Sequence, residues 1–308
     1  MLRPMNMPIS TRSRACLRIA NALWLAASML CASSAFAQQG GADLNISPKR
    51  VVFDAATRTA TVYVLNRGTA AGSYTIDLEE RVMTPDGQII ALADADKDPA
   101  GKAAAAAMKS ARPLLTYTPR RVTLEPGASQ VIRLRALRPA DLAAGEYRSH
   151  LSVTTVPPED SGLTAEQAAK ADSGQLAFRV VSLFSLSIPL IVRQGEAAAS
   201  VALENPTLST EQLSPPEGGA AVTTSVLGVD LVRSGTGSVY GNIEVRAGKA
   251  GEVIGTIRGL AVYPEIERRA TKIKLTRNPT AAEHLVVTFT DDDRHPGAVL
   301  ATGALNAH

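Results

Sequence analysis

Short β-type segments, which recur about every 8–12 residues, are the feature that most limits the fold of this chain. In Thr59–Leu65, β-branched and aromatic residues dominate, and in Ser73–Arg81 apolar and polar residues alternate. Turn signals follow each segment, at Asn66-Arg67-Gly68 and at Pro85-Asp86-Gly87. Alternation with a period of two places one face of a strand in a core and the other in solvent. Many such strands with few helical patterns predict antiparallel β-sandwiches.

The expected strands form two sets, separated by a hinge at Gln194-Gly195-Glu196. The first set comprises Leu44–Phe53 (interrupted by Pro48), Thr59–Leu65, Ser73–Arg81, Leu114–Tyr117, Val122–Leu124, Gln130–Ala136, Gly145–Val156 and Leu176–Val192. The second set comprises Gly228–Arg233, Val239–Arg246, Glu252–Val262, Thr271–Leu275, His284–Phe289 and Ala298–Leu305. Because proline has no N–H to give to a sheet, the segment with Pro48 should lie at an edge or pass between sheets.

Two polar, alanine-containing stretches interrupt the strands of the first set. Residues 94–111 hold a run of alanines, Ala103–Ala107, flanked by charges, and are expected to form an inserted loop or a short helix. Residues 159–174 are expected to form a second inserted loop. A length of 308 residues fits two domains. We therefore expect an N-terminal immunoglobulin-like sandwich over 38–193, which carries both insertions, and a C-terminal one over 194–308.

The first 37 residues are typical of a secretory signal peptide. Arginines but no acidic residues precede an apolar run, Ile19–Ala32, and the segment ends in the small-x-small site Ala35-Phe36-Ala37. The apolar run is too short to span a bilayer comfortably, so an uncleaved signal anchor is the less favoured alternative. Cleavage predicts a protein that works outside the cytoplasm without stable membrane insertion. It removes Cys16, Cys31 and four of the arginines, so 28 basic residues remain against 29 acidic ones.

The predicted mature chain lacks the residue patterns of an enzyme or a metal protein. Without cysteine it has no thiol chemistry, and without net positive charge it does not resemble a nucleic-acid binder. His150 lies near Glu146 and Ser149, but neighbours on a strand point to opposite faces, so a structural role is favoured over a triad. Asp291-Asp292-Asp293 fits a charged turn better than a calcium loop, and Gly235-Thr236-Gly237 fits a hairpin better than a phosphate loop. We expect no catalytic residue, cofactor or metal.

Two further segments suggest surfaces that meet other molecules. A group of arginines alternates along or flanks a predicted strand, which favours a solvated face, with an acidic partner as the alternative: Arg120, Arg121, Arg133, Arg135 and Arg138. The strand Leu176–Val192 is apolar on both faces across its middle. It is either a central strand in a thick core or an edge strand that a partner covers by adding a strand of its own.

Four stretches in order carry a resemblance to a known family. They are Ile46–Phe53 (ISPKRVVF), Val64-Leu65-Asn66, Tyr117–Gly127 (YTPRRVTLEPG) followed by Val131 and Arg133, and Gly145–Leu151 (GEYRSHL) running to Val156-Pro157-Pro158. Together, and behind a signal peptide, they resemble the periplasmic pilus chaperones of the chaperone–usher pathway. The resemblance covers most of residues 44–193 and extends more loosely over the rest.

The resemblance implies two immunoglobulin-like sandwiches joined at an angle by a short hinge. It also implies a mechanism, in which the last strand of the first domain completes the sandwich of a pilus subunit. Basic residues hold the C-terminal carboxylate of that subunit. By position, Arg50 is the carboxylate anchor. The residues expected to face the subunit are Phe178, Val180, Ser182 and Phe184.

The sequence departs from the family at its second basic anchor. Pro189 stands where the family has a lysine, and Arg193 is the possible substitute. The resulting expectation is a periplasmic chaperone that binds pilus or surface-fibre subunits by donor-strand complementation and delivers them to an outer-membrane usher. The alternative is an immunoglobulin-like structural or adhesive module of the cell surface without chaperone activity.

Overall fold

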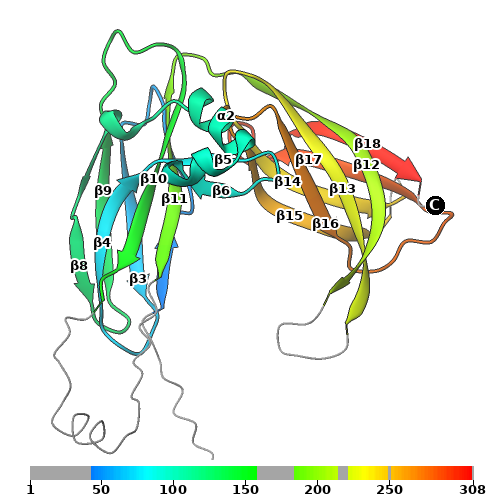
Figure 1. The fold of residues 1–308 in the computed structure, drawn as a ribbon, viewed down its shortest axis with the longest axis horizontal. Coiled ribbons are helices and arrows are strands. Elements are labelled where there is room, and N and C mark those ends of the chain that lie inside the picture. The colour runs from blue at the N-terminus through cyan, green and yellow to red at the C-terminus, as the bar shows by residue number, and fades with distance from the viewer. Residues whose placement is uncertain (1–42, 158–183, 214–220, 249–250, 307–308) are drawn as a thin grey trace, which may run out of the picture. The chain divides into compact units, whose positions relative to one another are not determined.

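The computed structural model describes residues 43–157, 184–213, 221–248 and 251–306 (Figure 1). The predicted signal peptide, the predicted insertion at 159–174 and the first part of the strand expected over Leu176–Val192 lie outside these residues. Within them the chain is almost entirely β, as predicted, and the strands form two sandwiches.

The N-terminal sandwich packs a four-stranded sheet, in the order β1-β3-β9-β7, against a five-stranded sheet, in the order β2-β11-β10-β4-β8. Its strands are β1 (Leu44–Ser47), β2 (Val51–Phe53), β3 (Thr59–Asn66), β4 (Gly72–Glu79), β7 (Leu115–Thr118), β8 (Arg121–Leu124), β9 (Ser129–Ala136), β10 (Gly145–Thr155) and β11 (Ser185–Gln194). Burial alternates along the strands and so defines the core. In β3, Val62 and Val64 are buried, whereas Thr61 before them and Tyr63 between them are exposed.

The segment around Pro48 passes from one sheet to the other, as its proline predicted. On one side of it β1 pairs antiparallel with β3, and on the other β2 pairs parallel with β11. Both β1 and β2 are edge strands. Arg50 comes directly before β2, so the passage of the chain from one sheet to the other fixes the position of its Cα atom.

The stretch over 94–111 is mostly helical, which decides between the two predicted alternatives. It follows the hairpin of β5 (Arg81–Met83) and β6 (Ile89–Ala91) and contains the 3-10 helix η1 (Leu92–Lys97) and the helix α2 (Pro99–Ala107); the short 3-10 helix η2 (Arg112–Leu114) comes next. Asp98 caps α2, because its carboxylate accepts hydrogen bonds from the N–H groups of Ala100 and Gly101 at 2.8 and 3.0 Å. The alanine run then supplies strong helix formers. Ala104 packs into the same core cluster as residues of the C-terminal sandwich.

The C-terminal sandwich packs a three-stranded sheet, in the order β12-β13-β16, against a four-stranded sheet, in the order β15-β14-β17-β18. Its strands are β12 (Ala199–Leu213), β13 (Val222–Gly235), β14 (Val239–Ala247), β15 (Val253–Val262), β16 (Arg268–Lys274), β17 (His284–Asp291) and β18 (Val299–Asn306). The sequence pattern missed β12. Its alternation is broken at Asn205-Pro206, where the register with β13 shifts in a bulge.

The predicted hairpin at Gly235-Thr236-Gly237 is wrong. β13 and β14 do not pair, because each belongs to a different sheet, and the turn between them carries the chain across the sandwich. Both glycines are needed for close backbone approach: a Cβ on Gly235 would lie 2.4 Å from the carbonyl oxygen of Ala198, and one on Gly237 would lie 2.2 Å from that of Ala197. The predicted charged turn at Asp291–Asp293 is confirmed, between the paired strands β17 and β18.

Candidate functional site

Arg50, the predicted carboxylate anchor, binds a carboxylate of the chain itself. Its two terminal nitrogens contact the two oxygens of Asp293 at 2.9 and 3.2 Å, a bidentate arrangement. The guanidinium also lies over the ring of Tyr240, 4.6 Å from the ring centre. Only 10% of the Arg50 side chain is exposed. The site thus shows the geometry by which an arginine at this position holds a carboxylate.

Arg193, the predicted substitute for the second anchor, reaches the same carboxylate. It lies at the end of β11, where its Nε donates to Glu146 Oε2 at 3.0 Å and a terminal nitrogen contacts Asp293. The backbone N–H of Ser238 also donates to Glu146, at 3.2 Å. We call Arg50, Arg193, Glu146 and Asp293 the arginine–carboxylate cluster.

Sequence reasoning missed both carboxylates of the cluster. Glu146 lies directly across from Arg193 in the pairing of β10 with β11, so the signal was a cross-strand pair of opposite charge. That signal becomes visible only when the register of the two strands is known. Asp293 lies in the β17–β18 turn, 243 residues from Arg50, and nothing local to either residue connects them.

The cluster is nearly buried and balanced in charge, with two guanidinium groups and two carboxylates. Burial alone would raise the pKa of Asp293, but hydrogen bonds and charge interactions with Arg50 and Arg193 lower it to about 2. Burial would lower the pKa of Arg193, but the hydrogen bond to Asp293 and the charge of Glu146 raise it. Within the described residues the buried Nε of Arg50 has no partner. It is the spare donor of the cluster.

β11 is partly an interior strand and partly an edge strand. It pairs with β10 along its whole length, but with β2 only at Leu190–Val192. Across the described residues, Ser185–Pro189 therefore has one unpaired edge. Leu186 and Ile188 point to the core of the N-terminal sandwich, together with Leu190 and Val192. Pro189 fits the unpaired edge because it has no N–H to offer there.

The predicted subunit-binding residues lie mostly beyond the described ranges. Phe178, Val180 and Ser182 fall outside them. Phe184 precedes β11 and is 58% exposed, although it is a large apolar side chain. Its carbonyl oxygen accepts a hydrogen bond from the N–H of Thr155 on β10 at 2.9 Å.

His150 of β10 is buried. Only 3% of the residue is exposed, and burial, with a further contribution from Arg148, lowers its pKa well below 6.5. Arg148 itself forms a buried ion pair with Glu265 and stacks 3.8 Å above the ring centre of Tyr263. Burial raises the pKa of Glu265 despite the adjacent charge of Arg148.

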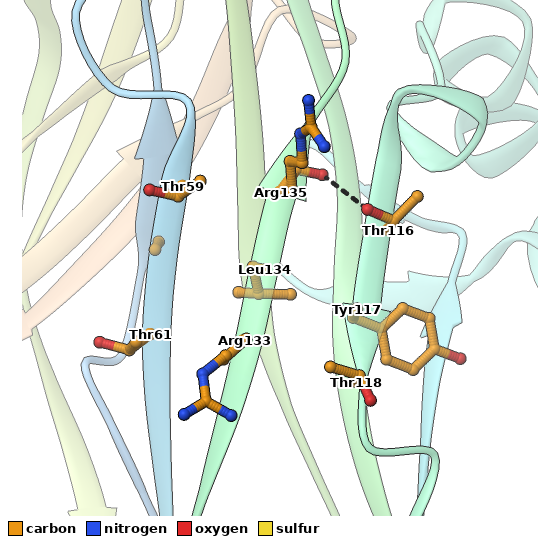
Figure 2. Close-up of a pocket in the computed structure, with 9 residues that line it drawn as sticks. Thr59, Thr61, Thr116, Tyr117, Thr118, Arg133, Leu134 and Arg135 are labelled. Atoms are coloured by element: carbon orange, nitrogen blue, oxygen red, sulfur yellow. Dashed lines mark hydrogen bonds between the residues drawn. The ribbon is translucent and has the colours of Figure 1, made fainter.

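Of the arginines predicted to form a solvated face, Arg138 is half-buried and donates to the backbone oxygen of Arg193 at 3.2 Å. The others are exposed: Arg120, Arg121, Arg133 and Arg135. Arg133 and Arg135 lie on β9, between the threonines of β3 and those of β7 (Figure 2). They line a hollow of about 670 Å³; its lining residues are Thr59, Ala60, Thr61, Thr116, Tyr117, Thr118, Arg133, Leu134 and Arg135. Arg120 is engaged elsewhere, with its guanidinium donating to the hydroxyl of Tyr117 at 2.7 Å.

Two kinds of feature are absent from the part of the chain that the structure describes. No three His, Cys, Asp or Glu side chains come together there as a group able to hold a metal ion. Nor does any helix there have the length and apolar character needed to cross a membrane.

Comparison with known proteins finds likenesses only among solved structures. No protein-family model and no curated protein matches the chain. The YadV chaperone is 15% identical, with 86% of this chain and 99% of that chain covered, at a TM-score of 0.40. The CupB2 chaperone of Pseudomonas aeruginosa is 14% identical (86% and 100% covered, TM-score 0.40), and the E. coli chaperone DraB is 12% identical (87% and 97%, TM-score 0.41).

The chain is similar in structure to fimbrial chaperones. At such identities and TM-scores, the likeness assigns no role to any single residue of the site. The roles proposed below are therefore argued from the geometry of this chain.

Proposed function

We propose that this chain is a non-enzymatic periplasmic chaperone. In this proposal it binds incomplete subunits of a pilus or surface fibre by lending them the edge of β11, and delivers them to an outer-membrane usher. The observation that carries the proposal is the unpaired edge of β11 at Ser185–Pro189. The predicted signal peptide supports a periplasmic location. As part of the same proposal, the mature chain divides into two domains between residues 193 and 194.

The edge of β11 has the properties that an incomplete sandwich requires. A subunit that lacks a strand exposes both its core and a row of unpaired backbone groups. An added strand supplies backbone hydrogen bonds along its edge and apolar side chains on one face. Among the described residues, the face of β11 that carries Leu186 and Ile188 packs into the core of the chain's own sandwich, and Phe184, just before the strand, is the exposed apolar side chain. The predicted contacts of Phe178, Val180 and Ser182 would extend the same strand.

The arginine–carboxylate cluster supports a role in holding the C-terminus of the subunit. Arg50 already binds one carboxylate through two nitrogens, so the carboxylate of a subunit would take the place of Asp293 there; its buried Nε has no partner among the described residues. Arg193 is held next to it by Glu146. We propose that the carboxylate of the subunit binds at Arg50, with Arg193 as the second basic residue.

Two of the structurally similar proteins are chaperones whose structures were solved in complex with a subunit. They are the SafB chaperone with the SafA pilin of Salmonella enterica, and CsuC with the tip subunit CsuE of Acinetobacter baumannii. For this chain, clients of the same class are proposed from its sequence motifs and the edge of β11.

Hydrogen exchange on the isolated chain tests the unpaired edge. Phe184 gives its carbonyl to β10, so by alternation the N–H groups of Leu186 and Ile188 also face β10, and those of Ser185 and Ser187 face the open edge. We expect fast exchange at Ser185 and Ser187 and slow exchange at the two apolar positions. Slow exchange at all four would mean that the edge is already paired, and would favour the structural or adhesive module.

A matched pair of variants tests strand lending itself. Ser187→Pro removes the N–H that faces the open edge, whereas Ser187→Ala keeps it; both lose the hydrogen bond between the hydroxyls of Ser187 and Ser152. Each variant is purified by an affinity tag from a periplasmic extract of the organism that encodes it, and the proteins recovered with it are identified. We expect Ser187→Ala to co-purify with a subunit and Ser187→Pro to lose it. Equal recovery with both would contradict the proposal. Arg50→Ala should lower recovery without unfolding the chain.

A further inference from the structure

A regular pattern of arginine and threonine covers the outer face of the sheet β1-β3-β9-β7. In the register of β3, β9 and β7, Thr61, Arg133 and Thr118 form one row, and Thr59, Arg135 and Thr116 form the next. We call these six residues the Thr-Arg-Thr face. They belong to the hollow of about 670 Å³ and all are exposed.

The two guanidinium groups of this face are free to bind a ligand. Within the described residues, neither Arg133 nor Arg135 has a side-chain hydrogen bond or an ion pair. Figure 2 shows their heads pointing toward opposite ends of β9, with the space between them open. Beside them, the hydroxyl of Thr116 donates a hydrogen bond to the backbone oxygen of Arg135 at 3.5 Å. Unpaired guanidinium groups favour carboxylate or phosphate ligands.

The sheet also offers backbone groups beside the arginines. β7 is the last strand of its sheet, so Leu115–Thr118 has one edge without a neighbour among the described residues. A strand added there would lie about 10 Å from β9, two strand spacings away. Threonine is the only side chain between them in each row, and the long side chains of arginine and glutamate can meet above it.

The spacing of the arginines matches an extended peptide. The Cα atoms of Arg133 and Arg135 are two residues, about 6.7 Å, apart along the strand, and alternate residues of an added strand repeat at the same distance. The two guanidinium heads point apart (Figure 2), so each side chain would turn toward its own carboxylate. Charge, spacing and a free edge together favour a peptide over a compact anion.

We propose that the Thr-Arg-Thr face and the free edge of β7 bind an extended segment of a partner protein with acidic side chains on alternate residues. This site is separate from the edge of β11 and from the arginine–carboxylate cluster, and it does not rest on the proposed chaperone function. The sequence pattern left an acidic partner as the alternative for these arginines, and the proposal assigns that partner to this surface.

The test measures binding of a synthetic peptide to the full mature chain. The probe is a nine-residue peptide of alternating Glu and Val, compared with one of alternating Gln and Val. The test variant is Arg133→Gln/Arg135→Gln. The control Arg67→Gln/Arg258→Gln removes the same charge from exposed arginines elsewhere. We expect the Glu peptide to bind the wild type and the control equally, and the test variant about tenfold more weakly, with affinity falling as salt is added.

A second measurement identifies the edge. Hydrogen exchange should slow at the amides of Leu115–Thr118 when the Glu peptide is bound. Equal affinity for the test and control variants, or unchanged exchange in β7, would overturn the proposal. Heparin is included as a competing polyanion. If heparin binds through Arg133 and Arg135 and the Glu peptide does not, the partner is not a peptide.

Discussion

Asp293 is the residue at which the structure makes its sharpest prediction about stability. It is a single carboxylate shared by the guanidinium groups of Arg50 and Arg193, and 11% of its side chain is exposed. Asp293→Asn keeps the size and one acceptor oxygen but removes the charge. It leaves two buried positive charges facing Glu146 alone. We expect the variant to fold and to be less stable at neutral pH.

The size of the effect follows from the pKa. Asp293 has a pKa of about 2 in the folded chain, against an ordinary value of 3.8. At about 1.4 kcal/mol per unit, this difference contributes about 2 kcal/mol to the free energy of unfolding. Because the pKa is lowered by folding, the contribution is fully present above pH 3.8 and is lost as the pH falls toward 2. The loss on mutation could exceed this figure at neutral pH, since the two arginines also lose their partner.

The assay is urea unfolding of the full mature chain, followed by circular dichroism at several pH values between 7 and 2. The matched control is Asp292→Asn, which removes the same charge from the exposed neighbouring residue. The free energy of unfolding of Asp293→Asn should lie about 2 kcal/mol or more below that of the wild type from pH 7 to pH 5. The gap should close by about 2 kcal/mol between pH 4 and pH 2. Asp292→Asn should follow the wild type throughout.

Two results would refute this reasoning. A gap that stays constant from pH 7 to pH 2 would mean that the charge of Asp293 is not the source of the effect. No gap at neutral pH would mean that the arginines do not depend on Asp293. Neither result depends on the identity of a client.

Three other predictions concern buried or crowded positions. Arg148→Ala should lower the free energy of unfolding by about 3–5 kcal/mol, because it leaves the buried carboxylate of Glu265 without its ionic partner. A decrease below about 1 kcal/mol, measured by urea unfolding, would contradict this. His150 should stay neutral as the pH falls below 6.5 while the unfolded chain takes up a proton, so the wild type should lose stability there relative to His150→Gln. Parallel pH profiles of the two proteins would count against it. Gly241→Ala should lower the thermal midpoint, since the new Cβ would lie 2.0 Å from the carbonyl oxygen of Thr290, and an unchanged midpoint would show that β14 can shift.

Much of the fold was predictable because strand periodicity is a local property. Val62 and Val64 alternate with polar or exposed neighbours, and the pattern alone places them in a core. Pro48 breaks a strand at the point where the chain changes sheet. β12 was not predicted for the same physical reason: the bulge at Asn205-Pro206 interrupts the two-residue alternation by which a strand is recognised in a sequence.

Turns were predictable in position but not always in kind. Gly235 and Gly237 indicate a turn, and the structure has one. Whether a turn joins two paired strands or crosses between sheets depends on which strands pair, and that depends on packing across the sandwich. The turn at Asp291–Asp293 shows the same limit. Its charge suggested a simple charged turn, yet Asp291 is buried and Asp293 is nearly buried against Arg50.

The sequence by itself determined the β architecture and the exposed arginines of β9, and its motifs indicated Arg50 as a candidate anchor. Those properties are recorded in neighbouring residues, because burial alternates along a strand. Only the tertiary structure decided what Arg50 and Arg193 bind. Asp293 is 243 residues from one and 100 from the other, and no local pattern encodes an ion pair over such a separation. The same holds for the free edges of β7 and β11, since an edge is defined by the strand that is not beside it.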